Sequence, residues 1–492
     1  MRWRRLRGDS PDPMRRHASP NSCSRRALMS EVPDLSVTRT IHIVGVAGVG
    51  MAPISGALAG MGHRVSGSDH LELAILEQVR AAGVHVEVGH RVSNIPADAD
   101  VVAFSTAVPA DNLELVEARR RGVPVVHRSE LLAAMAATKP TIGVAGTHGK
   151  TTTSAMITHI LRELDAHPSF VIGGELVDRG LGAAWDSGSW FVVEADESDG
   201  SGFAIACGAI VVTNIEPDHL EYHGSVENLH AAFAAFMASA NGPCVVCADD
   251  DVAAGLGAEI HARSYGTTAS ADYRIVDPRS TRGSSTFGLV VDGVAVGEVQ
   301  LPVPGIHNIR NATAALAVVN ELGFDLGAAL HALESFAGVS RRFQFRGEVN
   351  AITFVDDFAH LPTEIAAAVA AAHDGGWGRV VAVFQPHRYS RTQSLWREFG
   401  DAFVGADELI LTDVYAAAEA PRAGVTGELI VEIVATTHPE QSVVYIPERG
   451  LLAQEVAARL RAGDLCLTIG AGDITGLADE IIECLTDRPG VL

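Results

Sequence analysis

Short apolar runs alternate with amphipathic segments along most of the chain. "RTIHIVGVAGVG" is typical of a buried strand that ends in a glycine turn, and "MAPISGALAGMG" after it is typical of a helix leading to the strand "HRVSG". Two more strand-like runs, "VVAFSTA" and "VPVVH", flank the helical pattern of "DNLELVEARRRG". This alternation predicts a first α/β domain over residues 38–138.

The same alternation continues through the rest of the chain. From "TKPTIGVAGTHGKTTT" on, the strand-like runs are "SWFVVEADE", "CGAIVVTNIE" and "GPCVVCADD", then a glycine-rich β region over 265–303, and the helical "NIRNATAALAVVNEL" closes a second domain, 139–336. A third domain, 337–492, contains "GRVVAVFQ", "DELILTDVY", "SVVYIP" and "GDLCLTIGAGD" between alanine-rich helical patterns. The expected fold class is therefore α/β with three successive domains and no internal repeat.

Composition narrows the class of protein. A length of 492 residues favours about three domains, and a net charge of -23 opposes binding to nucleic acid. No apolar run reaches the ~18 residues of a membrane span. Six scattered cysteines do not form a secreted disulfide framework and indicate a reducing cytoplasm. We expect a cytoplasmic protein without membrane or nucleic-acid partners.

The first residues are rich in Arg, Ser and Pro and lack the apolar segment of a signal peptide. We expect residues 1–37 to form a disordered basic tail, with Met29 as an alternative start of the chain. A basic arm that contacts nucleic acid is the less favoured interpretation.

The stretch "AGTHGKTTT", residues 145–153, follows a strand-like run and opens a helical pattern. The strict phosphate-loop spacing fails because Val144 stands where the first glycine belongs, but Gly146 and Gly149 still allow a glycine turn before a helix N-terminus, which attracts anions. Lys150 would reach the β and γ phosphates of a nucleotide, and the Thr151 hydroxyl would bind Mg²⁺. A glycine turn with an N-capping threonine is the alternative. The apolar face expected of the helix is Ile157, Ile160, Leu161 and Leu164.

Two further stretches could supply metal ligands. Glu194 stands where the apolar run of "WFVVEADESD" ends, at the strand edge where open α/β sheets bind ligands, although a solvated acidic loop is the alternative. His219 and His223 are four residues apart, but Glu221 is displaced from its place in a zinc-protease motif. We favour magnesium chemistry with His219 over zinc, and capping or surface histidines remain the alternative.

Three glycine or cysteine patterns carry weaker signals. "GVAGVG", residues 45–50, with Asp69 about 20 residues on, predicts a diphosphate or nucleotide pocket. Pro53 replaces the third glycine of the dinucleotide fingerprint and disfavours a redox cofactor. We interpret "GAGDITG", 470–476, as a turn, and "CVVC", 244–247, as buried structural cysteines.

These motifs, in this order, resemble those of the Mur ligases, the ATP-dependent amide-forming enzymes of peptidoglycan synthesis. The matching stretches, which span about residues 40–478, are "GVAGVGM", "SGSD", "GTHGKTTT", "EADESD", "NIEPDH", "GIHNIRNATAA", "GVSRRFQ", "DDFAH" with "PTE" one residue on, "FQPHRYSRT" and "GAGDI". The resemblance implies a UDP-binding Rossmann-like domain, a central P-loop ATPase domain and a C-terminal Rossmann-like domain that closes over the site.

The resemblance also implies the chemistry. ATP would phosphorylate a substrate carboxylate, and the amino group of an amino acid would displace the phosphate, with ATP and Mg²⁺ as cofactors. The motifs are similar to those of the branch that acts on UDP-N-acetylmuramic acid and L-alanine. We expect the protein to be a monomer or homodimer. A muropeptide-recycling or other Mur-like ligase is the runner-up. An idle nucleotide-binding or NAD-binding regulator is disfavoured by the intact Lys150, Glu194, His219 and Asp357.

Site residues follow from the resemblance position by position. The expected ATP-binding residues are Gly146, Thr147, His148, Gly149, Lys150, Thr151, Thr152, His307, Asn308, Asn311, Arg342 and Asp357. The expected metal ligands are Thr151, Glu194 and His219. Catalysis is expected to depend on Lys150, His219, Arg342, His360, His387, Arg388 and Arg391. The UDP-linked substrate is expected to contact Gly45, Gly48, Gly50, Asp69, Ser105, Asp196 and Ser198.

The chain departs from the family pattern in three places. Phe358 and Leu361 replace a tyrosine and a histidine, so alanine is the expected amino acid and glycine or serine are alternatives. No lysine follows Lys150, which agrees with the branch that lacks a carbamylated lysine. The loop "GGELVDRGLGAAWDSG" lacks an asparagine often found near the sugar, which leaves the muramyl contacts open.

Overall fold

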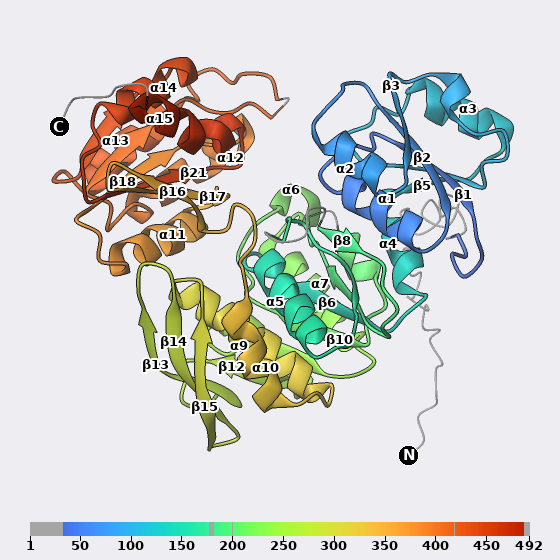
Figure 1. Cartoon of the computed structure of the whole chain (residues 1–492), viewed down its shortest axis with the longest axis horizontal. Coiled ribbons are helices and arrows are strands. Elements are labelled where there is room, and N and C mark those ends of the chain that lie inside the picture. The colour runs from blue at the N-terminus through green and yellow to red at the C-terminus, as the bar shows by residue number, and fades with distance from the viewer. Residues whose placement is uncertain (1–32, 177–181, 199, 418, 487–492) are drawn as a thin grey trace, which may run out of the picture.

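The computed structural model describes residues 33–176, 182–198, 200–417 and 419–486. Three β-sheets, each flanked by helices, follow one another along the chain, and Figure 1 shows the central domain lying between the two others. The prediction of a three-domain α/β architecture is confirmed. The domain boundaries remain a prediction, and the tail expected over 1–37 lies mostly outside the described residues.

The N-terminal sheet is five-stranded and parallel, in the order β3-β2-β1-β4-β5. Helices follow β1, β2, β4 and β5, as the apolar pattern predicted, because parallel neighbours need crossover connections, whereas only a 3-10 turn lies between β3 and β4. The strands are β1 Thr40–Val44, β2 Arg64–Asp69, β3 His85–Val88, β4 Val101–Phe104 and β5 Val125–His127. The helices are α1 Met51–Gly60, α2 Ile75–Ala81, α3 Leu113–Arg121 and α4 Arg128–Ala136, with a 3-10 turn at Val92–Asn94.

The central sheet has ten strands, in the order β15-β14-β13-β12-β11-β10-β6-β9-β7-β8. Its parallel core places β6 between β9 and β10, and β13–β15 extend it as an antiparallel meander. The strands are β6 Thr141–Ala145, β7 Ser169–Val171, β8 Ala183–Ala184, β9 Phe191–Glu194, β10 Ala209–Val212, β11 Cys244–Cys247, β12 Arg263–Gly266, β13 Tyr273–Ser280, β14 Ser285–Val291 and β15 Val294–Leu301. The helices are α5 Lys150–Glu163, α6 Leu220–His223, α7 Val226–Ala238, α8 Asp251–Glu259, α9 Ile306–Glu321 and α10 Leu326–Ala332, with 3-10 turns at Gly202–Ala204 and Leu333–Ser335.

The C-terminal sheet is six-stranded, in the order β16-β17-β21-β18-β19-β20, and only the β16–β17 pair is antiparallel among its described strands. Sequence patterns did not identify that hairpin. Its turn is Asn350–Ala351, both at positive φ, where an Asn-Gly pair would have been recognisable. The strands are β16 Gln344–Val349, β17 Ile352–Asp357, β18 Arg379–Phe384, β19 Glu408–Leu411, β20 Ser442–Tyr445 and β21 Asp464–Ile469. The helices are α11 Pro362–Asp374, α12 Tyr389–Leu395, α13 Glu428–Thr437, α14 Arg449–Ala457 and α15 Leu477–Thr486, with 3-10 turns at Trp396–Asp401 and Asp473–Gly476.

Two smaller predictions can be checked in the fold. Cys244 and Cys247 are free and buried in β11, which confirms their interpretation as structural cysteines. "GAGDITG" begins at the end of β21 and continues as the 3-10 turn Asp473–Gly476, so it is a short turn as predicted. Of the described helices, none is long and apolar enough to cross a bilayer.

Candidate active site

The loop after β6 has the predicted strand–turn–helix form, with α5 beginning at Lys150. Gly146 (φ 131°) and Gly149 (φ 80°) adopt backbone conformations that other residues disfavour. A Cβ at Gly149 would lie 2.5 Å from Asn311 Oδ1, and one at Gly146 would collide with the Thr213 hydroxyl. The two glycines therefore let the loop lie close against its neighbours and turn its N–H groups toward the start of α5.

Lys150 is held in this loop by a carboxylate that sequence reasoning did not assign. Its Nζ lies 2.8 Å and 2.9 Å from the two oxygens of Glu197 and donates to the carbonyl of Gly146 at 2.5 Å. Burial alone would lower the pKa of Lys150, but the carboxylates of Glu197 and Asp196 outweigh it and raise the pKa. The ammonium is therefore charged and placed beside the phosphate loop.

Glu194, at the end of β9, lies beside the N-terminus of α5. Its Oε2 accepts from the Thr151 hydroxyl at 3.2 Å, and its Oε1 accepts from the N–H of Gly173 at 2.6 Å. Burial raises the pKa of Glu194 above its usual value. Two of the predicted metal ligands, Thr151 and Glu194, are thus adjacent, and their oxygen atoms are of the kind Mg²⁺ prefers.

The two histidines of "IEPDHLEYHG" do not share a helical face. His219 is the N-cap of the short helix α6, with a left-handed φ of 52°, and its Nε2 lies 3.4 Å from Asp218. His223 Nε2 donates to the carbonyl of Glu197 at 2.9 Å, so it supports the acidic loop. The predicted role of His219 as a metal ligand remains a prediction. Within the described residues, three or more His, Cys, Asp or Glu side chains nowhere converge as a metal cluster.

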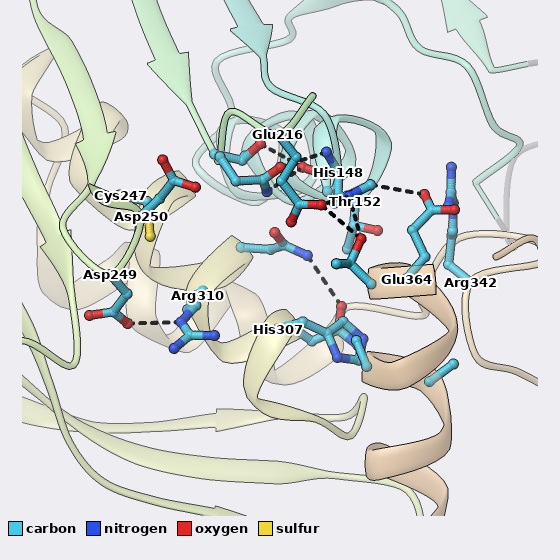
Figure 2. A pocket seen from close by; sticks show the side chains of 18 of the residues that line it. His148, Thr152, Glu216, Cys247, Asp249, Asp250, His307, Arg310, Arg342 and Glu364 are labelled. Carbon is cyan, nitrogen blue, oxygen red and sulfur yellow. Dashed lines mark hydrogen bonds and ion pairs between the residues drawn. The ribbon is translucent and has the colours of Figure 1, made fainter. Parts of the chain in front are cut away.

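A cavity of about 290 Å³ opens between the central and C-terminal domains, beside the phosphate loop (Figure 2). Asn308 and Asn311, both on α9, line it. The Thr153 hydroxyl of α5 donates to Asn311 Oδ1 at 3.2 Å, and Asn311 Nδ2 donates to Asn308 Oδ1 at 3.4 Å. Eight of the twelve residues predicted to bind ATP line this cavity: His148, Gly149, Thr152, His307, Asn308, Asn311, Arg342 and Asp357. The other four, Gly146, Thr147, Lys150 and Thr151, are not among its lining residues.

His307 supplies the sharpest test of whether this cavity suits a ligand. Its Nδ1 is buried and has no hydrogen-bond partner among the described residues, which is costly unless a ligand or water pairs with it. Burial, and after it the charge of Arg310, lowers the pKa of His307 to about 4, so the ring is neutral. A neutral, unpaired imidazole on the wall of a cavity beside a phosphate loop fits a nucleotide base, so the residues present fit ATP.

The C-terminal domain contributes Arg342 and Asp357 to the same cavity. Asp357 ends β17 and accepts from the N–H groups of Phe343 and Ala359, both at 2.7 Å. Burial raises the pKa of Asp357 to about 6, against the influence of Arg342. Arg342 Nη2 lies 3.5 Å from the Thr151 hydroxyl, so it reaches the first turn of α5 from the other domain.

The residues predicted to form the amino-acid pocket lie near the ends of β17 and β18. The rings of His360 and His387 lie 5.9 Å apart, and His387 stacks on Tyr415 at 5.8 Å, a residue that sequence reasoning missed. Arg391 Nη1 lies 3.1 Å from His387 Nδ1. Arg388 is held at φ 70° at the start of α12, with its N–H on the Tyr415 carbonyl. Strained backbone of this kind is concentrated at functional sites.

The two departures from the family pattern occupy this pocket's edge. Phe358 packs its ring against the guanidinium groups of Arg341 and Arg342, at 4.9 Å and 5.3 Å. Leu361 is buried at the N-cap of α11. Phe358 therefore keeps an aromatic platform for the arginines, and the hydroxyl of the usual tyrosine is absent.

The candidate UDP site lies at the ends of the N-terminal strands. The N–H of Gly45 donates to Ser68 at 2.8 Å and that of Gly48 to Gly45 at 3.1 Å, while Gly50 caps α1. Asp69 is buried and accepts from the N–H of Ala47 at 2.9 Å, so in this structure it supports the glycine loop. Ser105 is half-buried directly after β4. Ligand contacts by these residues remain predictions.

A second cavity, about 110 Å³, connects that loop to the acidic stretch of the central domain. Gly50 and Arg128 line it from one side and Glu194 and Asp196 from the other. Asp196 accepts from the N–H of Ser198 at 3.0 Å and faces Arg128 at 3.9 Å. A substrate spanning this cavity would bring its far end to Glu194.

Several residues of the site were missed, although each stands in a quoted motif or beside one. Glu197 follows Glu194 in the acidic stretch, Glu216 precedes "PDH", and Thr363 and Glu364 end "DDFAHLPTE". The only local signal was the Pro-Thr-Glu order after Leu361, which is typical of a helix start with a glutamate at its third position.

Three comparisons with known proteins agree with this geometry. The chain matches the Mur ligase family, catalytic domain over residues 40–140, the Mur ligase middle domain over 144–319, and the Mur ligase, glutamate ligase domain over 341–472.

Full-length relatives were also found. The UDP-N-acetylmuramate–L-alanine ligase of Kineococcus radiotolerans is 44% identical over 91% of this chain and 96% of its own length. That of Saccharopolyspora erythraea is 44% identical over 90% and 92%. A crystal structure of UDP-N-acetylmuramate-alanine ligase from Thermotoga maritima superposes with a TM-score of 0.78 at 29% identity, over 91% of this chain and 99% of that one. The chain belongs to the Mur ligase family.

Proposed function

We propose that the chain joins L-alanine to UDP-N-acetylmuramic acid, with ATP converted to ADP and phosphate, in peptidoglycan precursor synthesis. The observation that carries this is the N-terminus of α5 beside the cavity, where Lys150 is the first residue of the helix and Arg342 reaches Thr151 from the C-terminal domain. The relatives that match 91% and 90% of the chain are UDP-N-acetylmuramate–L-alanine ligases by name. ADP is bound in the related MurF ligase of Thermotoga maritima, whose 17% identity supports the fold alone.

In the first step, an oxygen of the substrate carboxylate attacks the γ-phosphorus of ATP, and the bond between that phosphorus and the ADP oxygen breaks. Lys150 and Arg342 hold the equatorial phosphate oxygens, where charge accumulates in the transition state. Glu194 and Thr151 would hold Mg²⁺, which would neutralise phosphate charge when bound. His307, Asn308, Asn311 and Asp357 orient the nucleoside.

In the second step, the amino group of alanine attacks the carbonyl carbon of the acyl phosphate, and phosphate leaves as the amide forms. Arg388 and Arg391 are placed to hold the alanine carboxylate, and a paired arginine contact fixes its direction. Burial, followed by Arg391, lowers the pKa of His387 to about 4, and burial lowers that of His360. Both rings are neutral near pH 7 and can accept the proton that the amine loses.

The proposal extends to setting and partners. We infer a cytoplasmic enzyme, where ATP is available, acting on small molecules as a monomer or homodimer without nucleic-acid or membrane partners. The net charge of -23 supports the exclusion of nucleic acid.

The test is phosphate release from ATP and Mg²⁺ with UDP-N-acetylmuramic acid and each of L-alanine, glycine, L-serine and a muropeptide-type tripeptide. We expect the highest kcat/KM with L-alanine and a product heavier by one alanyl residue. Preference for the tripeptide would establish the recycling ligase instead. No release with any of the four acceptors would refute ligase activity.

A further inference from the structure

Glu364, on the first turn of α11, contacts both the phosphate loop and the predicted amino-acid pocket. Its Oε1 lies 3.3 Å from Nδ1 of His148 in the phosphate loop of the central domain. Its Oε2 lies 3.3 Å from Nδ1 of His360 in the amino-acid pocket of its own domain. Figure 2 shows the carboxylate reaching from α11 toward His148. We propose that Glu364 is a positioning residue that couples the nucleotide loop to the amino-acid pocket across the domain boundary.

On the central side, His148 is firmly anchored. Its backbone N–H donates to Asn214 Oδ1 at 2.8 Å, and its carbonyl accepts from Thr213 and Asn214 at 2.5 Å and 3.0 Å. The Nε2 lies 3.1 Å from Glu216 Oε2. The ring is therefore a rigid projection of the phosphate loop, and any group that pairs with it takes its position from that loop.

A second contact also joins α11 to the phosphate loop across the domain boundary. The Thr363 hydroxyl donates to Glu216 Oε2 at 2.9 Å and lies 2.8 Å from His148 Nε2. Two consecutive residues of α11 thus contact the same imidazole from opposite ends. The His148 side chain is 15% exposed and that of Glu364 13%, so water competes little for the ion pair.

On the C-terminal side, Glu364 sets the orientation of His360. The His360 Nδ1 lies 3.2 Å from the carbonyl of Phe358, which can only accept, so Nδ1 carries the hydrogen. The Glu364 carboxylate beside it favours the same tautomer and also accepts from the N–H of His360 at 3.0 Å. In the neutral ring, Nε2 is then left as the acceptor that the second step requires.

The consequence is that docking of the C-terminal domain is linked to the second reaction step. When the C-terminal domain docks, His148 takes one oxygen of Glu364 and fixes the carboxylate plane, so that the other oxygen holds His360. Without His148, the carboxylate keeps its helix-capping contacts but loses the restraint that defines its rotation. This link rests on the proposed function, because it assigns His360 to the acceptance of the amine proton.

Three variants separate the two arms of the link. Glu364→Gln keeps the side-chain shape and can still cap the helix, because glutamine serves at that position. We expect it to weaken binding of a non-hydrolysable ATP analogue about tenfold and to raise KM for alanine by a similar factor, because it removes the charge that lies beside both histidines. Thr363→Val, at an exposed position, touches only the nucleotide arm, so it should weaken analogue binding about threefold and leave KM for alanine unchanged.

His148→Gln completes a double-mutant cycle with Glu364→Gln. We expect the double variant to lose no more analogue affinity than the worse single variant, because both changes break one interaction. The matched control is Glu334→Gln, which removes a carboxylate from the exposed His331–Glu334 pair and should change neither quantity. Additive losses in the cycle, or a Glu364→Gln variant with unchanged KM for alanine, would overturn the proposal.

Failure of the proposed function can be told apart from failure of the link. If the unaltered chain gives no product with UDP-N-acetylmuramic acid and alanine, the proposed function fails. The cycle in ATP-analogue affinity needs no turnover and still decides whether His148 and Glu364 are coupled. Thermal unfolding of each variant confirms that the compared proteins are folded, and Thr363→Val remains informative if Glu364→Gln does not fold.

Discussion

The central domain has two neighbours and meets them in different ways. Toward the N-terminal domain the contact is mainly apolar, with the Arg128–Asp196 pair at its edge: α1 packs on β7 and β8, and the buried side chains of both domains form one continuous cluster. Gly60 at the end of α1 leaves room for Trp185, since a Cβ there would lie 3.2 Å from the Trp185 Cβ. The N-terminal domain is therefore attached through a shared core.

Toward the C-terminal domain the contacts around the nucleotide cavity are polar. His148 faces Glu364, Arg342 reaches Thr151, and Arg282 donates to the carbonyl of Gly376 at 3.0 Å. The apolar side chains of the C-terminal domain form two clusters of their own. Polar interfaces between domains are the ones that open and close most readily. The difference indicates that the first two domains move as one body and that the third closes on it.

The largest expected effect contrasts the only two lysines of the chain. Lys150→Ala should lower kcat for phosphate release about 10³-fold, because it removes a charge from the transferred phosphate. Lys139→Ala should leave kcat nearly unchanged, because Lys139 Nζ lies away from the phosphate loop: it donates to the Asp186 and Gly188 carbonyls and lies over the Trp185 ring, all within the central domain.

Stability must be controlled in that comparison. Lys150→Ala leaves Glu197 buried and unpaired, which costs roughly 3 kcal/mol. The double variant Lys150→Ala/Glu197→Gln relieves the unpaired charge and should recover thermal stability without recovering turnover. Recovery of turnover in the double variant would contradict a role of Lys150 on the phosphate.

These contacts also show what sequence alone could predict. The phosphate loop was predictable because strand, glycines and helix are consecutive, and Glu194 because it ends an apolar run. The pairing of Lys150 with Glu197 joins residues 47 apart, and that of Thr363 with His148 joins residues 215 apart in different domains. Such contacts depend on how sheets and domains pack, which no local pattern records. Tyr415 was missed for the same reason, since only the stacking on His387 marks it.

The next prediction addresses the apolar interface. Trp185→Ala should lower the free energy of unfolding by about 2 kcal/mol, since the half-buried indole packs on Phe191 and beside α1. Calorimetry should show the N-terminal and central domains unfolding together and earlier, with the C-terminal transition unmoved. Phe399→Ala, in the C-terminal core, is the counterpart and should shift that transition alone. A shift of all transitions in both variants would mean that the three domains form one cooperative unit.

A pH profile tests the polar interface. Burial alone would lower the pKa of His148, but Glu216 from the central domain and Glu364 from the C-terminal domain raise it from 6.5 to about 9. The contribution of the protonated ring to closure is therefore fully present below pH 6.5 and is lost as pH rises through 9. Affinity for a non-hydrolysable ATP analogue should fall over this range by at most about tenfold per pH unit. His148→Gln should flatten the profile, and equal slopes in both proteins would exclude this ion pair as the cause.

The smallest effect is expected at the outer edge of the same interface. Arg282, exposed on the β13–β14 turn, donates to Gly376 and lies 5.6 Å from the Trp377 ring of the C-terminal domain. Exposed contacts of this kind contribute less than about 1 kcal/mol, so Arg282→Ala should weaken analogue binding less than fivefold and slightly raise the radius of gyration of the liganded protein. Arg279→Ala, exposed on the same strand β13, controls for the lost charge. A loss equal to that of Glu364→Gln would mean that closure is held at the edge of the interface, which would contradict the contrast between an apolar N-terminal interface and a C-terminal interface controlled by charges around the cavity.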